Sequence, residues 1–250
     1  MKLFLVIALF FSSTPFSFSQ DVTSMLKEAE RLEALPDEKA AFNKFKLILK
    51  ADPDNLLALC KASELCSRIG NREVVVNARD NYYAAAVSYA KQALKVSPNS
   101  DEANVAMGIA IGRTSLTKSG KEKISAAKDI KHYAETALKS NPRNFKAWHI
   151  IGKWNYEVAN LNFVERTATK VFYGGLPNAS LKNSIMAYEK ARSLNGTFLL
   201  NYLELAKAYK RNDQLQKSIA LLRAIAPLPI QTEDDPRIKK EAAMLLKNWL

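Results

Sequence analysis

Few residues in this chain of 250 have the types and spacing that catalysis requires. His132 and His149 are the only histidines, and neither has a Cys or a second His at the spacing of zinc ligands. The single Gly pair, Gly174-Gly175, precedes Leu-Pro and does not follow a strand pattern, unlike a phosphate-binding loop. The sequence therefore predicts a protein that is not an enzyme, with no metal site and no cofactor.

Cys60 and Cys66 are the only cysteines and lie six residues apart on one expected helix. Six residues of α-helix rise about 9 Å, whereas a disulfide needs Cα atoms within about 7 Å of each other. We therefore expect two small buried helix residues that are not bonded to each other. An intermolecular bridge or a metal-binding role is the alternative.

The composition of the chain indicates its broad class of protein. The chain has 37 Lys and Arg against 25 Asp and Glu, a net charge of +12, and it is 48% hydrophobic. These values are globular and exclude a disordered chain or a protein that crosses a membrane several times. Low Gly and Pro contents, with much Ala, Leu and Lys, favour helices. The positive charge favours an acidic partner or a nucleic acid.

A spaced triplet recurs four times and predicts the helices that must position any binding residue. Two small or slim residues four apart are followed, eight residues later, by a Pro or Gly that stops the helix. Each triplet predicts the second helix of a helical hairpin. The triplets are Ala41, Phe45 and Pro53; Ala86, Ala90 and Pro98; Ile130, Ala134 and Pro142; and Ser184, Tyr188 and Gly196.

A fifth unit shows which kind of repeat this is. Its residues follow the 34-residue spacing of tetratricopeptide (TPR) repeats, whereas periods of 44 and 45 between the earlier triplets would also suit HEAT repeats. The extra residues of units two and three predict lengthened second helices. Those of unit four predict an added helix over 163–173, ended by Gly174-Gly175-Leu176-Pro177. The fifth-unit positions are Tyr202, Leu205, Ala206, Tyr209, Ser218 and Leu222.

The predicted fold is all-α: a TPR-like right-handed superhelix of about five helical hairpins with long helical inserts and a capping helix at the C-terminus. Residues 20–250 form one domain in this prediction. The capping helix spans Pro236 to Leu250, with Asp235 as its cap and a stripe of Leu245, Leu246 and Trp249 that covers the open end of the stack.

One face of each first helix should line the inner wall of such a superhelix. Helical offsets place seven cations there against Glu64, Glu102 and Glu157, with His149 and Tyr156 on the same face. We predict a positive groove with an apolar floor that suits a carboxylate-bearing peptide, because Lys and Arg donate charge-assisted hydrogen bonds to carboxylates. Solvated charges on a Lys-rich protein are the alternative. The seven cations are Arg68, Arg113, Lys146, Lys153, Lys207, Lys210 and Arg211.

Other conspicuous side chains have simpler interpretations. We expect both histidines to be solvated surface residues. Trp148, Trp154, Tyr156 and Phe163 have the spacing of core residues between helices, and Tyr156 is the best candidate for a ligand contact. A run of lysines predicts a solvated helix face. These are Lys118, Lys121, Lys123, Lys128 and Lys131.

Unit four contains two segments that resemble a known family. They are Gly152-Lys153-Trp154-Asn155-Tyr156-Glu157-Val158 and Leu161-Asn162-Phe163-Val164-Glu165-Arg166, followed by Ala168. With the surrounding region from Asp101 to Trp249, they resemble the regulator of microtubule dynamics family, and a weaker likeness extends back to about Met25. The resemblance implies an all-helical TPR-like scaffold. It also implies that relatives associate with microtubules or join organelle membranes.

The N-terminal residues have the pattern of a secretory signal peptide. Lys2 precedes an apolar run from Leu3 to Phe11, and small serines follow. A spanning helix needs about 20 apolar residues, so we predict cleavage after Ser19 and export to the periplasm or the medium, as in a bacterial-type family member. An uncleaved anchor is the alternative.

Three functions follow from these observations. The leading hypothesis is a non-catalytic scaffold that binds a partner protein or acidic peptide in its concave groove. The second is binding or transfer of a phospholipid-like amphipathic ligand between the elongated helices of units two to four. The third is association with microtubules. Nucleic acid is not expected, because the interleaving of basic and aromatic residues typical of nucleic-acid platforms is absent.

Overall fold

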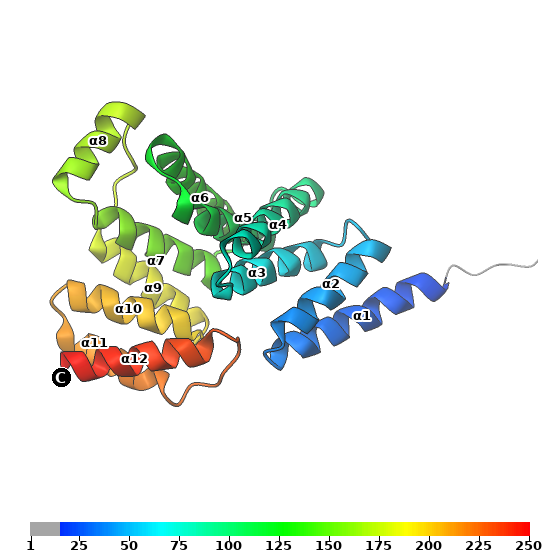
Figure 1. Ribbon diagram of the computed structural model, residues 1–250. Coiled ribbons are helices and arrows are strands. Elements are labelled where there is room, and N and C mark those ends of the chain that lie inside the picture. The colour runs from blue at the N-terminus through cyan, green and yellow to red at the C-terminus, as the bar shows by residue number, and fades with distance from the viewer. Residues whose placement is uncertain (1–15) are drawn as a thin grey trace, which may run out of the picture.

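The computed structural model describes residues 16–250, except the side chains of 16–21, 117 and 173. The apolar run on which the export prediction rests therefore lies outside the described residues. The described chain is helical throughout (Figure 1). Its helices are α1 (Phe16–Ala34), α2 (Glu38–Ala51), α3 (Leu56–Arg72), α4 (Val76–Val96), α5 (Asp101–Thr114), α6 (Gly120–Ser140), α7 (Phe145–Ala159), α8 (Phe163–Tyr173), α9 (Leu181–Leu194), α10 (Leu199–Arg211), α11 (Leu215–Ile225) and α12 (Asp235–Trp249), with a short 3₁₀ turn at Ser115–Thr117.

The helices pair into five hairpins, as the sequence predicts. The pairs are α1 with α2, α3 with α4, α5 with α6, α7 with α9, and α10 with α11. The first helices α3, α5, α7 and α10 follow one another along the stack, so the hairpins form a curved superhelix (Figure 1). The all-α, TPR-like prediction is confirmed.

The triplets explain where the hairpins pack and where their second helices end. Among the helical residues of the triplets, Ile130 is half-buried and the others are fully buried. The fully buried residues are Ala41, Phe45, Ala86, Ala90, Ala134, Ser184 and Tyr188. Each of these second helices ends two residues before its Pro or Gly. A Pro cannot donate the backbone hydrogen bond that the next helical turn needs, so the helix stops there.

The insertions take the predicted helical form. α4 and α6 each have 21 residues, against 14 in α2 and in α9. In unit four the insertion is the separate helix α8, with the predicted bounds. Gly174 ends α8 in the left-handed region at φ 70°, a conformation that glycine adopts without steric cost.

The last helix covers the end of the stack, but its start was predicted one residue late. α12 begins at Asp235, which therefore does not cap it from outside. The Asp235 carboxylate instead accepts hydrogen bonds from the backbone N–H groups of Gln231 and Thr232, at 2.7 and 2.8 Å, and so fixes the preceding loop. As predicted, Leu245, Leu246 and Trp249 pack against the core formed by α10 and α11.

The two cysteines behave as the helix spacing predicts. Cys60 and Cys66 lie buried in α3 and form no disulfide. Burial raises the pKa of each thiol to about 12. Both side chains are therefore protonated and unreactive at neutral pH, because only the thiolate is nucleophilic.

Candidate partner-binding wall

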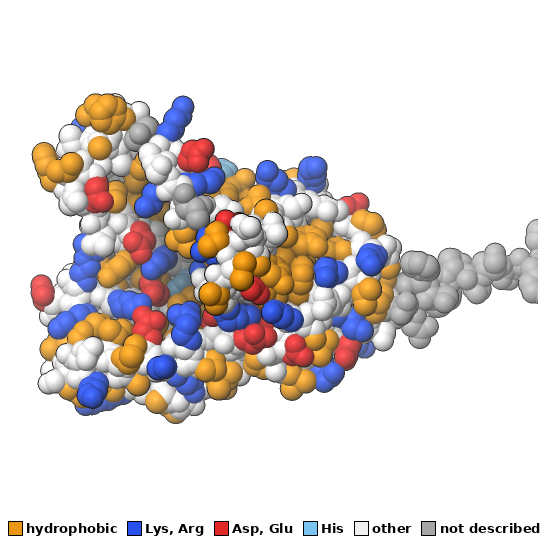
Figure 2. Space-filling view, in the orientation of Figure 1, with side chains coloured by type: hydrophobic (Ala, Val, Ile, Leu, Met, Phe, Trp, Pro, Cys, Tyr) orange, Lys and Arg blue, Asp and Glu red, His pale blue; other side chains and the backbone are white. Residues whose placement is uncertain are grey.

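The inner wall is the face formed by α3, α5, α7 and α10, and acidic side chains from several helices meet its cations. Figure 2 shows Lys and Arg side chains interspersed with Asp and Glu over the visible face. The predicted surplus of positive charge counted positions on the first helices only. The structure adds carboxylates from α1, α2 and α12, and these pair with Arg68 and Lys207 of the predicted set. Carboxylates of the loop before α12 pair with Arg72, which the prediction did not include.

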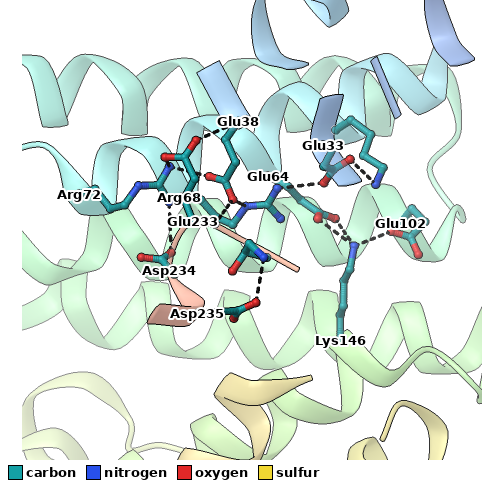
Figure 3. Close-up of polar contacts among 12 residues, drawn as sticks. Glu33, Glu38, Glu64, Arg68, Arg72, Glu102, Lys146, Glu233, Asp234 and Asp235 are labelled. Atoms are coloured by element: carbon teal, nitrogen blue, oxygen red, sulfur yellow. Dashed lines mark hydrogen bonds and ion pairs between the residues drawn. The ribbon is translucent and has the colours of Figure 1, made fainter. Parts of the chain in front are cut away.

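Lys146 joins two units through their carboxylates. Its Nζ lies 2.8 Å from Glu64 on α3 and 3.5 Å from Glu102 on α5 (Figure 3). Burial by itself would lower the pKa of the ammonium, but Glu64 and Glu102 outweigh it and raise the pKa. Burial would likewise raise the pKa of Glu64, and Lys146 holds it below the usual value instead. The two charges are therefore mutually stabilised inside the wall.

Glu204 joins α7, α10 and α12 in the same way. Its carboxylate lies 2.8 Å from Lys153 Nζ and 3.1 Å from Lys207 Nζ. Lys207 also pairs with Glu241 of α12 at 2.8 Å, and Lys153 with Glu157 at 2.9 Å. Burial would raise the pKa of Glu204, yet Lys153 and Lys207 hold it below its usual value. Both lysines thus serve the packing of neighbouring units.

Arg68 and Arg72 of α3 connect the second hairpin to the first. Arg68 pairs with Glu33 and Glu38 at 2.9 Å each, and Arg72 Nη2 lies 2.6 Å from Glu38 (Figure 3). Glu38 is fully buried. The two arginines of α3 therefore form ion pairs with Glu33 at the end of α1 and with Glu38 at the start of α2.

Arg72 also forms ion pairs with residues near the C-terminal end of the chain. Arg72 lies 3.1 Å from Glu233 and 3.4 Å from Asp234, and the Glu38 backbone N–H donates to Glu233 at 2.8 Å across 195 residues (Figure 3). We call Glu38, Arg72, Glu233 and Asp234 the clasp. Sequence reasoning missed all four, because no helical period relates residues so far apart in the chain.

His149 is not the solvated residue that the sequence predicted. Its Nδ1 lies 3.0 Å from Asn201 Oδ1, and its ring packs edge-on against Phe198 at 4.9 Å and near Tyr188 at 5.3 Å. Burial lowers the pKa of the imidazole, so it is neutral at physiological pH. His132 on α6 is exposed, as expected. Arg113, also predicted on the wall, donates to Asn71 at 2.9 Å.

The remaining predicted wall cations, Lys210 and Arg211, face aromatic rings. The Arg211 guanidinium lies 5.3 Å from the centre of the Tyr156 ring, and Lys210 Nζ lies 5.7 Å from that of Trp249. Arg211 is exposed, and the other three side chains are partly exposed. In the described part of the chain, neither cation forms an ion pair with a carboxylate. We call Tyr156, Lys210, Arg211 and Trp249 the aromatic–cation cluster.

Several residues of the family motif hold α6, α7 and α8 in position relative to one another. Trp154 is buried, and its Nε1 donates to the Ala127 carbonyl of α6 at 2.7 Å. Glu165 completes a capping box with Asn162 at the start of α8. Arg166 donates to the carbonyls of Leu161 and Ala159 at 3.0 Å, which ties α8 to the end of α7.

The core prediction holds for one of the four aromatic residues and fails clearly for another. Trp154 is buried, and Trp148 and Tyr156 are partly exposed. Phe163 is 82% exposed, so its assignment to the core was wrong. The motif that contains Phe163 starts a helix that stands outside the stack, and spacing within a helix cannot show whether another helix covers it.

Two further properties concern the described residues as a group. Among their side chains, no cluster of three His, Cys, Asp or Glu is arranged to hold a metal ion. None of the helices from residue 16 onward combines the length and apolar character that crossing a membrane requires.

Solved structures define the class of the fold. A TPR protein of Thermus thermophilus superimposes with a TM-score of 0.65 at 17% identity, covering 90% of this chain and 99% of that one. PilW, a type IV pilus biogenesis factor, superimposes with a TM-score of 0.55 at 18% identity, covering 92% and 87%. The chain is a TPR-like helical repeat protein.

Sequence comparison gives the family. The profile described as Regulator of microtubule dynamics protein 1-3 matches residues 25–249. Regulator of microtubule dynamics protein 1 of Bos taurus is 30% identical over 165 residues, covering 66% of this chain and 52% of that protein. Its Mus musculus counterpart is 31% identical over 163 residues, covering 64% and 53%. The chain belongs to this family and spans about half the length of these two relatives.

Proposed function

We propose that this protein is a non-catalytic scaffold that binds an acidic, partly apolar segment of a partner protein at the aromatic–cation cluster. The observation that carries the proposal is the difference between the cations of the inner wall. Lys146, Lys153 and Lys207 are already paired with carboxylates, whereas Lys210 and Arg211 face aromatic rings at the surface.

The chemistry of the cluster suits such a segment. Tyr, Trp and Arg are enriched among the residues that dominate protein interfaces, because they combine large apolar area with polar ends. Lys210 and Arg211 can donate hydrogen bonds to partner carboxylates without leaving a carboxylate of this chain unpaired. An acidic segment along the rest of the wall would have to compete with Glu64 and Glu204.

Charge reversal of the cluster tests the proposal. The probe is a short fluorescent peptide of alternating Glu and Leu, and binding is measured by fluorescence anisotropy. The double variant Lys210→Glu with Arg211→Glu should bind the peptide at least about tenfold more weakly, because two attractive contacts become repulsive.

The matched control reverses two exposed lysines on second helices, Lys50→Glu with Lys139→Glu. This control changes the net charge by the same amount and should bind as the wild type does. Equal weakening in both variants would show that net charge alone attracts the peptide, and the cluster would then not be the site.

A cleft between the elongated helices favours a second candidate, an amphipathic ligand such as a phospholipid. The cleft has a volume of about 640 Å³ between α4, α5 and α6. Val87, Leu94 and Ile111 offer apolar surface to acyl chains, and Lys91 and Lys95 offer cations to a headgroup. Native mass spectrometry after incubation with phosphatidylglycerol should show one bound lipid, which Ile111→Asp, at a partly exposed position in the cleft, removes. A protein that emerges without lipid would contradict this function.

Microtubule association and export remain proposals as well. The relatives' name suggests tubulin as a partner class, and co-sedimentation with polymerised tubulin tests it for this chain. Export predicts that the protein from its native cells begins at Gln20, which N-terminal sequencing determines. A protein that retains residues 1–19 would contradict cleavage.

A further inference from the structure

α8 exposes an apolar surface that the partner-binding wall does not use. Among its residues with described side chains, none is buried. Two of its exposed apolar residues are aromatic and two are β-branched. Their exposed fractions are 82% for Phe163, 73% for Val164, 67% for Val171 and 73% for Phe172.

These side chains share one face of the helix. At 100° per residue, Phe163, Val164, Val171 and Phe172 span half of the circumference, with Thr167 and Ala168 between them. The opposite half presents the polar residues Glu165, Arg166, Thr169 and Lys170. α8 is therefore an amphipathic helix whose apolar half points away from its polar contacts.

The protein holds this helix in place from its polar side. Arg166 fastens it to carbonyls at the end of α7, the Asn162–Glu165 capping box fixes its first turn, and α8 lies against α6. The apolar face is thus presented by specific contacts and is not part of a loose loop.

Cations gather beside the apolar face. Lys170 lies on α8 next to Phe163 in the helical projection, and the chain leading into α6 and its first turn supply Lys118, Lys121 and Lys123, all exposed. In Figure 2 hydrophobic side chains gather over α8 at the upper left, with Lys or Arg side chains over the adjoining α6. Glu122 and Glu165 are the acidic residues in these two segments.

We propose that α8 docks the protein on an anionic lipid bilayer, with Phe163, Val164, Val171 and Phe172 inserted at the headgroup boundary. An apolar helix face with flanking lysines is the arrangement by which helices lie in the interface of an anionic membrane. A protein partner or second copy fits less well. α8 has 11 residues, whereas a stable protein interface involves about 20 to 30 residues on each side.

A dye placed within the apolar face reports insertion directly. Because Cys60 and Cys66 are buried, Thr167→Cys gives one accessible thiol for an environment-sensitive fluorophore. Vesicles of phosphatidylcholine with phosphatidylserine should shift the emission to the blue, pure phosphatidylcholine should shift it much less, and added salt should reverse the shift. The same dye at Val74→Cys, on the loop after α3, should not shift.

The dye positions separate α8 from other membrane contacts. Attachment through the N-terminal segment would give no shift at position 167, or equal shifts at 167 and 74, and either result would overturn the proposal. Ile111 lies in the cleft between α4, α5 and α6 and not on α8, so Ile111→Asp should remove lipid binding by the cleft and leave this docking intact. The two proposals can therefore fail independently.

A second variant tests the four side chains themselves. Replacing all four with Ser should abolish the blue shift and leave the thermal unfolding midpoint unchanged, because none of the four is buried. Val74→Ser with Val75→Ser is the matched control, since both valines are exposed elsewhere, and it should keep the shift. A lowered midpoint in the fourfold variant would mean that the face packs on the protein, and a dimer that this variant dissolves would identify a second copy as the occupant. Either finding would overturn membrane docking.

Discussion

Lys146 shows how one side chain can look like a binding residue in the sequence and be a structural one in the molecule. Its helical position predicts that it lies on the inner wall. Its ammonium nevertheless lies between Glu64 and Glu102, on two preceding units. Glu64 is 5% exposed, so removing its cation leaves a charge inside the protein without a partner.

We therefore predict that Lys146→Met lowers the free energy of unfolding near neutral pH by about 3 kcal/mol. The pKa of Glu64 is lowered in the wild type, so the stability from its pairing is present above pH 4.5 and is lost as the pH falls further. In the variant, burial without Lys146 raises that pKa, and protonation relieves the unpaired charge. The difference between wild type and variant should therefore shrink as the pH falls towards 4.5 and below it.

Urea denaturation across this pH range measures the effect. Lys50→Met, at an exposed position, should change the free energy of unfolding by less than about 0.5 kcal/mol. The double variant Glu64→Gln with Lys146→Met should recover part of the loss. A single-variant loss that does not vary with pH would indicate lost packing and not an unpaired carboxylate.

At the scale of helices, the sequence predicted most of the fold and little of the charge pairing. The bounds of α8 and the ends of four second helices follow from local rules, because Pro and Gly act on the backbone where they stand. Glu204 meets Lys153 only after two units stack, and the exposure of Phe163 depends on which helix covers it. Such contacts depend on tertiary packing, which the period of a single helix does not contain.

The crossing of α7 and α9 depends on a residue without a side chain. These helices pack together although α8 separates them in the chain. The Ser184 hydroxyl donates to the Gly152 carbonyl at 2.8 Å, and a Cβ at Gly152 would lie 2.6 Å from Cδ1 of the buried Tyr188 ring. Gly152 therefore permits the close approach of the two helices.

We predict that Gly152→Ala lowers the free energy of unfolding by about 1–3 kcal/mol, because the Tyr188 ring or the helices must shift. Gly112→Ala is the control, since its Cβ would come no closer than 4.0 Å to Ile130. Alanine has the higher helix propensity, so this change should stabilise the protein by up to about 1 kcal/mol. Denaturant unfolding compares the two, and equal effects would show that close packing at Gly152 is unimportant.

At the scale of the whole molecule, the clasp makes the superhelix differ from an open stack. In a solenoid each unit contacts its neighbours, so the first and last units are free to move apart. Here the loop before α12 contacts the start of α2 and the end of α3, through Glu233 and Asp234. The distance between the two ends, and with it the curvature of the inner wall, is thereby fixed.

Neutralising the clasp should let the superhelix open. We predict that Glu233→Gln with Asp234→Asn increases the radius of gyration measured by small-angle X-ray scattering, and speeds amide hydrogen exchange in α2, because Arg72 loses both of its partners from the α12 loop. Arg72 keeps Glu38, so the first hairpin stays folded and the helical content measured by circular dichroism should not change. Glu30→Gln with Asp129→Asn removes the same charge from exposed positions and should leave the radius unchanged. If the clasp variant keeps the wild-type radius, hydrophobic stacking alone sets the curvature, and the wall would have the same shape in an open stack.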